Sequence, residues 1–546
     1  MKQRLVAATL AIAVLVSPAV SAAGETDRAT LEHDVRVLAD DAMEGRAAGT
    51  PGYQRAVDYV SRRMADIGLQ QGGDRDDTDR DWVQDFSLVR YGPARDTRMA
   101  IVGADGGRGE KLDYGLDFVG GGLAGAGEGR AEAEIVFVGY GLDLPALGYD
   151  DLDGVDLTGK IALWVPSDLE ASDPLLAAHL LQTGGDRFAA RGAVGSIMLW
   201  TPALSERFGW MQARNFLAGS SGTTWLAPDG TPYDPGAGMQ FQLVASPQLS
   251  RRLLEGQPLD LDALAAAQFA GTSALPAFDT GLKARVDYAV EVEHRLDTGN
   301  VVGMLPGTDP ALADQYVVMT AHLDHVGVRA GNGREGDLLF NGAMDNAVGV
   351  AMLLETARLM AANPPRRPML FVALGAEELG LLGSSYHAAH PDLEGGTVAV
   401  NVNVDMPILT WPFSDLVAFG ADRSNIYGTV AAAAAGHGLK LVPDPNPDEG
   451  FFFRSDQYSY VQRGVPAVYL DVGFGNGGDV AQQAFLSANY HQPSDEVSGV
   501  DFDQLQRFAD VAYDVTRGVA DMDARPAWNA GDVFGPLFGG PIADAP

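Results

Sequence analysis

Apolar residues recur along this chain with two different spacings, and the change between them divides it into regions. Between residues 30 and 69 they fall at helical intervals, for example at Leu31 and Val35, which predicts two helices around a turn-rich loop at residues 43–52. From residue 131 to about residue 275, short apolar runs alternate with turns, which is typical of strands. This middle stretch reads as a separate, β-rich unit.

The region after residue 286 alternates apolar strands with helical patterns. Residues 347–361 have helical spacing and end at a Pro-Pro pair that breaks the helix. Helices that alternate with apolar strands favour an α/β fold, in which a mostly parallel central sheet is flanked by helices. Four strands are predicted there, at residues 316–321, 369–374, 398–404 and 467–470.

Three of these strands end in residues that can bind a cation or move a proton. His322 and Asp324 follow the first strand, two positions apart, so that on an extended chain they point to the same side. Sites in open α/β sheets gather beyond the carboxyl ends of strands. We therefore expect these side chains to meet those of the other strand ends and of two loops, namely Asp345, Glu377, Glu378, Asp405 and His491.

The composition limits the number of domains, the type of metal site and the partners that are possible. At 546 residues the chain is long enough for two domains. It has no cysteine, so a metal would have to be held by histidine and carboxylate side chains. Its formal net charge of −35 argues against nucleic acid and anionic membrane surfaces as partners. The sequence leaves the oligomeric state open.

The first 23 residues have the pattern of a secretory signal peptide. Lys2 and Arg4 precede a short apolar run, and small residues follow up to Ala23. The run is too short for a good membrane span. We therefore expect a periplasmic or secreted protein that has no stable membrane association after signal cleavage.

The motifs together resemble the dizinc exopeptidases, a family that includes secreted bacterial aminopeptidases, aminopeptidase Y and glutamate carboxypeptidase. The matching stretches are Ala-His322-Leu-Asp-His, Gly-Ala-Met-Asp345-Asn, Ala-Glu-Glu378-Leu-Gly, Asn-Val-Asp405-Met, Arg-Ser-Asp456 and Tyr-His491-Gln-Pro-Ser-Asp-Glu. Residues 131–275 look like the protease-associated domain, a β-rich module that is often inserted into secreted peptidases. A generic α/β insert is the alternative for this stretch.

This resemblance implies a division of the chain. Residues 1–23 would be the signal peptide, residues 24–130 and 276–525 a discontinuous zinc peptidase domain, and residues 131–275 the protease-associated insert. Residues 526–546, which are rich in Gly, Pro and Ala, would form a loosely packed C-terminal tail.

The resemblance also implies a role for each site residue. Asp345 would bridge two zinc ions, with His322 and Asp405 completing one site and Glu378 and His491 the other. Asp324 would orient His322. Glu377 would act as general base and then as acid on peptide substrates, and Tyr490 would donate a hydrogen bond to the oxyanion.

Several points stay open at this stage. His325 is either an outer partner of the metal ligands or a structural residue, and His387 and His390 are expected at the surface. The family often has histidine where Gln457 stands, which puts the role of the preceding Asp456 in doubt.

The expected activity is that of an aminopeptidase, and three other readings compete with it. A carboxypeptidase of the same family would need arginines such as Arg454 or Arg463 to bind a C-terminal carboxylate. A non-catalytic binding protein would have lost metal ligands, and all of them are present here. A cyclotransferase would favour a single zinc.

Overall fold

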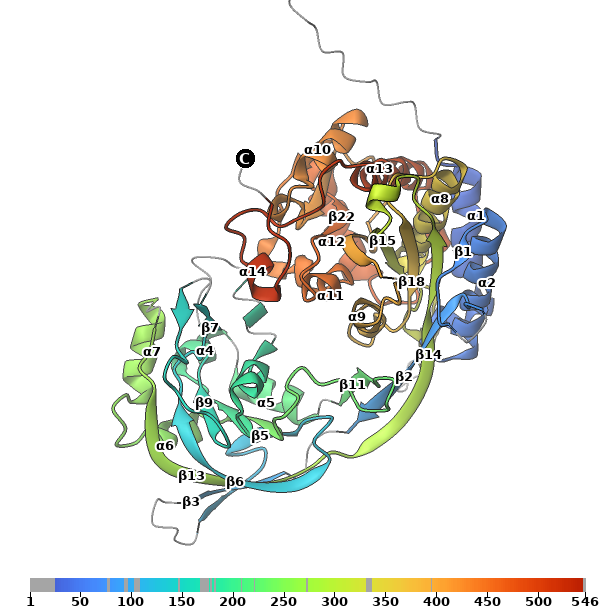
Figure 1. The fold of residues 1–546 in the computed structure, drawn as a ribbon. Coiled ribbons are helices and arrows are strands. Elements are labelled where there is room, and N and C mark those ends of the chain that lie inside the picture. The colour runs from blue at the N-terminus through green and yellow to red at the C-terminus, as the bar shows by residue number, and fades with distance from the viewer. Residues whose placement is uncertain are drawn as a thin grey trace, which may run out of the picture.

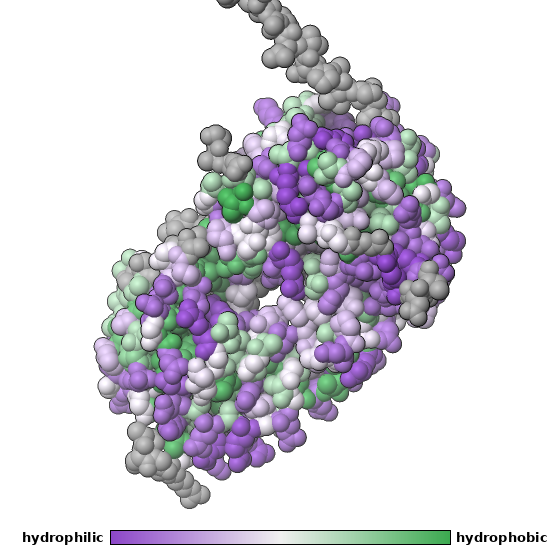
Figure 2. All heavy atoms as spheres, viewed as in Figure 1, coloured by the Kyte–Doolittle hydropathy of each residue, from purple (hydrophilic) through white to green (hydrophobic). Residues whose placement is uncertain are grey.

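The protein is described here by a computed structural model in which two lobes are joined by long, curved strands (Figure 1). Seen from the same side, the molecular surface is hollowed between the two lobes (Figure 2). The structure describes residues 25–75, 79–92, 97–102, 109–145, 148–166, 176, 179–180, 183–207, 209–219, 221–271, 274–329, 336–393 and 395–543. The expected signal peptide lies outside these residues. Among the described helices, none is both long and apolar enough to cross a membrane.

The larger lobe is built on a mixed sheet whose central strands are parallel. The parallel pairs of β18 (Met369–Leu374) with β15 (Gln315–His322), of β15 with β19 (Thr397–Val404) and of β19 with β22 (Ala467–Val472) confirm the strands predicted from the apolar runs. Antiparallel strands flank this centre, so the sheet as a whole is mixed rather than mostly parallel. The strand order is β11 (Gly222–Trp225), β2 (Val83–Tyr91), β14 (Val292–Leu305), β18 (Met369–Leu374), β15 (Gln315–His322), β19 (Thr397–Val404), β22 (Ala467–Val472), β20 (Asp415–Phe419) and β21 (Lys440–Val442), with β1 (Gln70–Gln71) beside β14.

Helices cover both faces of the larger sheet (Figure 1). The helix predicted at residues 347–361 forms as α8, and its apolar side chains lie in the core against β15 and β18. The two helices predicted near the N-terminus form as α1 and α2 and pack against α8. The helices of this lobe are α1 (Arg28–Leu38), α2 (Pro51–Ile67), α8 (Val348–Ala362), α9 (Leu382–Ala389), α10 (Tyr427–Gly436), α11 (Gln457–Val461), α12 (Gly478–Ala488) and α13 (Phe502–Ala520).

The smaller lobe contains a second mixed sheet with its own apolar core. Its strand order is β4 (Glu110–Leu112), β3 (Arg98–Val102), β13 (Phe278–Ala289), β6 (Glu128–Phe137), β9 (Ile161–Trp164), β10 (Gly195–Met198), β12 (Phe241–Ala245) and β5 (Phe118–Gly122). Its helices are α4 (Pro202–Arg207), α5 (Trp210–Gly219), α6 (Pro247–Leu253) and α7 (Leu261–Phe269). Two short hairpins complete the described strands, β7 (Asp143–Leu144) with β8 (Tyr149–Asp150) and β16 (Gly327–Val328) with β17 (Leu339–Phe340).

The second sheet does not begin and end where the insert was expected to. Strands before residue 131 and the strand β13 after residue 275 belong to it, so this sheet is formed by residues between Arg98 and Ala289. Conversely, β11 lies within the expected insert but pairs with β2 of the larger sheet. These strands were misplaced because their partners lie far away in the sequence.

The C-terminal segment is packed, contrary to the expectation of a loose tail. Trp528 and Phe534 are fully buried, and the indole of Trp528 donates a hydrogen bond to the carbonyl of Gly464 at 2.8 Å. The short helix α14 (Phe534–Phe538) lies where the two lobes approach each other (Figure 1), with Leu537 against the core of the smaller lobe. Two aromatic side chains thus anchor a segment whose Gly, Pro and Ala content suggested loose packing.

Candidate metal centre and active site

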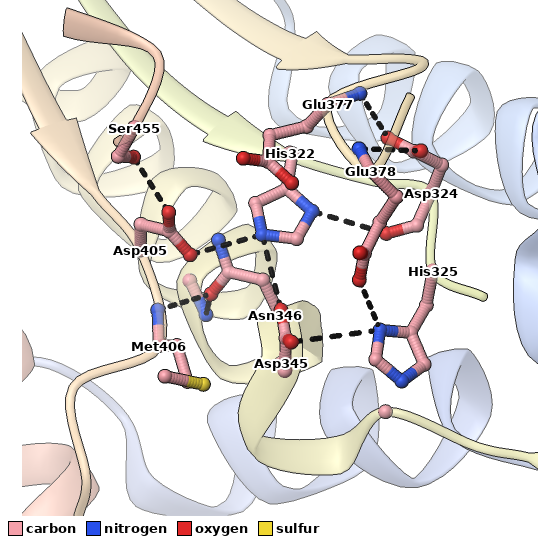
Figure 3. A network of polar contacts seen from close by, with 12 residues as sticks. His322, Asp324, His325, Asp345, Asn346, Glu377, Glu378, Asp405, Met406 and Ser455 are labelled. Carbon is pink, nitrogen blue, oxygen red and sulfur yellow. Dashed lines mark hydrogen bonds and ion pairs between the residues drawn. The ribbon is translucent and has the colours of Figure 1, made fainter. Parts of the chain in front are cut away.

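The carboxyl ends of β15, β18 and β19 meet at one edge of the larger sheet. His322 is the last residue of β15, and Asp405 directly follows β19. Glu378 lies in the turn after β18. Because these strands are parallel neighbours, their ends place the three side chains around one point, as Figure 3 shows.

A first group of possible metal ligands forms around His322. Its Nε2 atom lies 2.9 Å from Oδ1 of Asp405 and 3.2 Å from Oδ1 of Asp345. The imidazole is 1% exposed, and Asp345 is 4% exposed. The three side chains offer ligand atoms close enough to one another to hold a single cation.

A second group shares Asp345 with the first. The Nε2 atom of His491 lies 3.2 Å from Oδ2 of Asp345 and 3.0 Å from Oε2 of Glu378. His325 joins this group, with its Nδ1 atom 2.8 Å from Oε1 of Glu378. The five residues expected to bind metal are therefore brought together, and His325 is an addition that its neighbours in the sequence did not reveal.

Asp324 has a different contact from the one expected. The Nδ1 atom of His322 lies 3.0 Å from the main-chain oxygen of Asp324, not from its carboxylate. The carboxylate accepts hydrogen bonds from the backbone N–H groups of Glu377, at 3.0 Å, and Glu378, at 3.3 Å (Figure 3). The side chain thus fixes the turn that carries the two glutamates, while the main chain orients the histidine.

The loop before α8 is held from two sides. The carboxylate of Asp495 accepts hydrogen bonds from the backbone N–H groups of Met344, at 2.9 Å, and Asp345, at 3.0 Å. The side chain of Asn346, which follows a cis peptide bond, accepts from the backbone N–H of Met406 at 3.1 Å. Asp495 and Asn346 appear in the motifs, but their positioning role depends on contacts that the sequence does not display.

Arg46 holds two ligand-bearing loops together from beneath. Its guanidinium is 1% exposed and donates to the carbonyls of Leu323, at 2.9 Å, Asn341, at 2.6 Å, and Gly342, at 2.9 Å. A fourth bond goes to the carbonyl of Leu38 at 2.5 Å. The loop of residues 43–52, which the sequence marked only as turn-rich, therefore supports the site.

The Arg-Ser-Asp stretch supports Asp405. The hydroxyl of Ser455 donates to Oδ2 of Asp405 at 2.5 Å, which leaves Oδ1 toward His322. Asp456 is fully buried, and neither of its carboxylate oxygens has a hydrogen-bond partner among the described residues. Gln457, where the family often has histidine, bonds to the amide of Asn403 at 2.9 Å.

The turns that carry the possible ligands contain residues with left-handed backbone conformations, one of which is the ligand His491 itself. Ala376 has φ of 59°, Met406 has φ of 42° and His491 has φ of 51°. Such conformations cost a non-glycine residue about 1 kcal/mol or more, and they persist only where the surrounding structure imposes them. The turns that place the ligand side chains therefore carry local backbone strain.

The electrostatics of the cluster favour a bound cation. Burial alone would raise the pKa of Asp345, but the three surrounding imidazoles outweigh it and hold this pKa well below its usual range. Burial likewise lowers the pKa of His491, but the carboxylates of Asp345 and Glu378 outweigh it and raise this pKa to about 10. Without a metal, protons on His322 and His491 thus offset the charge of the carboxylates, and a cation in the same place would replace them.

The donor atoms fit zinc. Histidine nitrogens and carboxylate oxygens are ligands that zinc accepts. Nδ1 of His325 and Oε1 of Glu378 are buried and face each other without making a hydrogen bond, as two ligands of one cation would. The residues present therefore fit a bound zinc in the second group as well as in the first.

Both groups open onto one cavity of about 300 Å³. Glu377 and Tyr490 line it together with His322, Asp345, Asp405 and His491. The ring of Tyr490 stacks on His491, with centroids 4.0 Å apart. A larger hollow of about 1010 Å³ lies beside β2 and β14, but none of the eight predicted site residues lines it.

The histidines expected at the surface are not both there. His387 is 1% exposed, and its Nδ1 atom lies 2.8 Å from the hydroxyl of Tyr460. Burial lowers its pKa to about 4, so it is neutral at pH 7. Its place in an alanine-containing helix suggested exposure, but that helix, α9, packs against α11. His390 is partly exposed, as expected.

Comparison with known proteins identifies the part of the larger lobe that carries the site. The model of peptidase family M28 matches residues 300–516. These residues are a peptidase domain of family M28. All eight predicted site residues lie within the M28 domain, and the match confirms the resemblance read from the motifs.

Individual relatives of the M28 domain cover parts of this chain. Aminopeptidase YwaD of Bacillus subtilis is 28% identical over 197 residues, which are 36% of this chain and 39% of that protein. A probable zinc metalloprotease of Pyricularia oryzae is 34% identical over 115 residues, 21% of this chain and 20% of that protein. The matches thus span well under half of these two relatives.

A solved structure matches over a longer stretch. The aminopeptidase from Aneurinibacillus sp. strain AM-1 is 22% identical, with 90% of this chain and 93% of that chain covered and a TM-score of 0.43.

Proposed function

We propose that this protein is a secreted or periplasmic aminopeptidase that uses two zinc ions to remove the N-terminal residue of peptides. One observation carries the proposal: two buried ligand groups share Asp345 and open onto the same cavity as Glu377. The M28 match and two of the relatives, an aminopeptidase and a probable zinc metalloprotease, support it.

The ligands would divide between the two ions. His322 and Asp405 would hold one, Glu378 and His491 the other, with Asp345 between them and His325 beside Glu378. When bound, the zinc ions would polarise the scissile carbonyl and lower the pKa of the attacking water. A shared carboxylate is needed because two dications so close repel unless an anion lies between them.

Glu377 is the proposed general base. Among the described residues, its carboxylate makes no hydrogen bond or ion pair, so it is free to meet water in the cavity. Burial and the neighbouring carboxylates of Asp405, Asp456 and Glu378 outweigh the influence of His322 and raise its pKa well above the usual range. A raised pKa suits a group that takes a proton from water and returns it to the leaving amine.

Tyr490 is the proposed donor to the oxyanion. Tyr490 lines the cavity, and burial together with nearby carboxylates raises its pKa, which keeps its hydroxyl protonated. The stacking on His491 fixes the plane of its ring. A protonated, oriented hydroxyl is what this role requires.

The carboxypeptidase reading finds less support. Arg454 lines the cavity, but its guanidinium lies 3.3 Å from the carboxylate of Glu449, which already balances its charge. Arg463 does not line the cavity. A C-terminal carboxylate would therefore find no unpaired arginine among the described cavity residues.

The expected signal peptide supports a place outside the cytoplasm, and the second sheet remains a proposed protease-associated domain. Neither the signal peptide nor the identity of the second sheet changes the chemistry proposed for residues 322–491, and the experiment below tests that chemistry only.

The test compares Glu377→Gln with Glu378→Gln in protein reconstituted with zinc. Glu377→Gln should keep its zinc and lose about 10²–10⁴-fold in kcat/KM on leucine p-nitroanilide. Glu378→Gln should lose zinc as well as activity, because its oxygens face His325 and His491. Wild-type activity on N-acetylated substrates alone, or a fully active Glu377→Gln, would overturn the proposal.

A further inference from the structure

The cavity lining includes six residues that the proposed chemistry does not use, and we refer to the part of the cavity beside them as the side pocket. They are Met406, Ile408, Tyr469, Asp471, Gln482 and Leu486. Four of these side chains are apolar or aromatic, so they would surround a substrate side chain of some length. Asp471 and Gln482 are the two exceptions, and Asp471 places a carboxylate among apolar neighbours.

The strand β22 places Asp471 in this side pocket. Tyr469 and Asp471 are two residues apart on the strand, so both point to the cavity side. The hydroxyl of Tyr469 donates to the main-chain oxygen of Asp405 at 2.9 Å. The aspartate therefore lies one strand repeat, about 7 Å, beyond a residue in contact with a proposed metal ligand.

The carboxylate of Asp471 has no cationic partner among the described residues. Its Oδ1 atom accepts a hydrogen bond from the backbone N–H of Val472 at 2.7 Å, which leaves Oδ2 for the pocket. Burial, and then the nearby carboxylates of Asp405 and Asp444, raises its pKa well above the usual range. Asp471 is partly exposed and lines the cavity, so its unpaired carboxylate is within reach of a cationic group bound there.

Gln482 adds a second acceptor beside this carboxylate. Its Nε2 atom donates to the carbonyls of Val472, at 3.1 Å, and Gly473, at 3.4 Å. Its amide oxygen is therefore the atom left to face the pocket. Arg454, the cation that lines the cavity, is half exposed at its rim and is already paired with Glu449.

We infer that the side pocket binds the side chain of the N-terminal residue and selects lysine or arginine, with Asp471 as the specificity-determining residue. The apolar walls would contact the methylene groups, while Asp471 and Gln482 would accept hydrogen bonds from the cationic head. The inference rests on the proposed aminopeptidase function and adds to it the class of substrate.

A matched pair of substrates tests the inference on the wild-type enzyme. Lysine and norleucine p-nitroanilides have the same chain length and the same free α-amino group, and differ in the terminal ammonium. We expect kcat/KM to be about 10–100-fold higher for lysine, as a hydrogen-bonded charge in a partly buried pocket implies. Equal values, or a preference for norleucine, would overturn the inference while leaving the aminopeptidase function intact. If neither substrate is hydrolysed in the presence of zinc, the proposed function and the inference both fail.

Variants identify the residue responsible. Asp471→Asn should lower the lysine-to-norleucine ratio by about 10–100-fold, and Asp471→Leu should reverse the preference. Asp444→Asn is the control, because it removes a neighbouring negative charge that does not line the cavity, and it should change the ratio less than about threefold.

Two further results decide against the inference. An equal loss on both substrates in Asp471→Asn would mean that Asp471 binds the α-amino group instead. An unchanged ratio would mean that the selectivity arises elsewhere. Competition by lysinamide and by leucinamide on the wild-type enzyme gives the same comparison without a variant. Lysinamide should inhibit at a concentration at least about tenfold lower than leucinamide does.

Discussion

Replacing Arg46 by methionine should lower the free energy of unfolding of the protein and weaken zinc binding at the site. The guanidinium donates four hydrogen bonds to main-chain carbonyls, and three of these belong to Leu323, Asn341 and Gly342. Leu323 lies between His322 and Asp324, and Gly342 directly precedes the loop of Asp345. Methionine fills similar space but donates nothing, so four carbonyls would be left without this donor.

The structure gives the size of the effect. Leaving a buried acceptor unsatisfied costs about 1–3 kcal/mol. Taking the lower figure for each carbonyl, because a carbonyl has a second lone pair, we expect a loss of about 4 kcal/mol in the free energy of unfolding. Burial lowers the pKa of Arg46 to about 10, so the wild-type side chain is still charged at pH 7. Arg46→Lys keeps the charge with fewer donors and should lose less.

Urea denaturation of the metal-free protein at pH 7 measures the first effect, and zinc content after competition with a chelator measures the second. Arg62→Met is the matched control, because Arg62 is exposed on α2 and should change stability by no more than about 0.5 kcal/mol. Our account of Arg46 would be wrong if Arg46→Met stayed within about 1 kcal/mol of wild type and kept its zinc.

Three further predictions follow from the described contacts. Asp324→Asn should keep zinc but lower kcat/KM about 10–100-fold, because the turn that carries Glu377 shifts; loss of zinc at unchanged activity per zinc would contradict this. Zinc binding at pH 7 should release the proton held by His491, whose pKa is about 10 without metal, and calorimetry in buffers of different ionisation enthalpy should detect it. Burial raises the pKa of Asp186 from 3.8 to about 6, so the folded state favours its protonated form. The protein should therefore lose up to about 3 kcal/mol of its free energy of unfolding as the pH rises from 3.8 through 6. Asp186→Asn should remove this loss, as measured by urea titrations at pH 4.5 and 7.5.

The fold of the larger lobe was predictable because its strands are apolar on both faces. A parallel strand buried on both sides reads as a continuous apolar run, as at Val317 and Val318, and a turn or a helix must follow it. The smaller lobe was harder, since its sheet joins strands from both ends of the segment. Pairings such as β13 with β3 depend on contacts between residues almost two hundred positions apart, for which neither strand carries a signal.

The gathering of ligand side chains was predictable for a topological reason. Parallel neighbouring strands end at one edge, so His322 and Asp405 had to meet once their strands were recognised. His325 was undecided because the direction of a side chain in the turn after a strand is not fixed by periodicity. The sequence signal for His325 was its position three residues after His322. A histidine at that position in a loop could equally have pointed to solvent.

The sequence could not predict which atoms the supporting residues contact, and Asp324 shows why. Its spacing from His322 on an extended chain suggested a carboxylate beside the imidazole. The strand, however, ends at His322, so the alternation that justified the inference no longer applies two residues later. There the main chain turns, its carbonyl faces the histidine, and the carboxylate is free to accept from the N–H groups of Glu377 and Glu378. The same acid therefore acts on the turn of Glu377 and Glu378 rather than on His322. Because the shorter of its two hydrogen bonds goes to Glu377, at 3.0 Å against 3.3 Å, a substitution at Asp324 should lower the rate more than it lowers the zinc content.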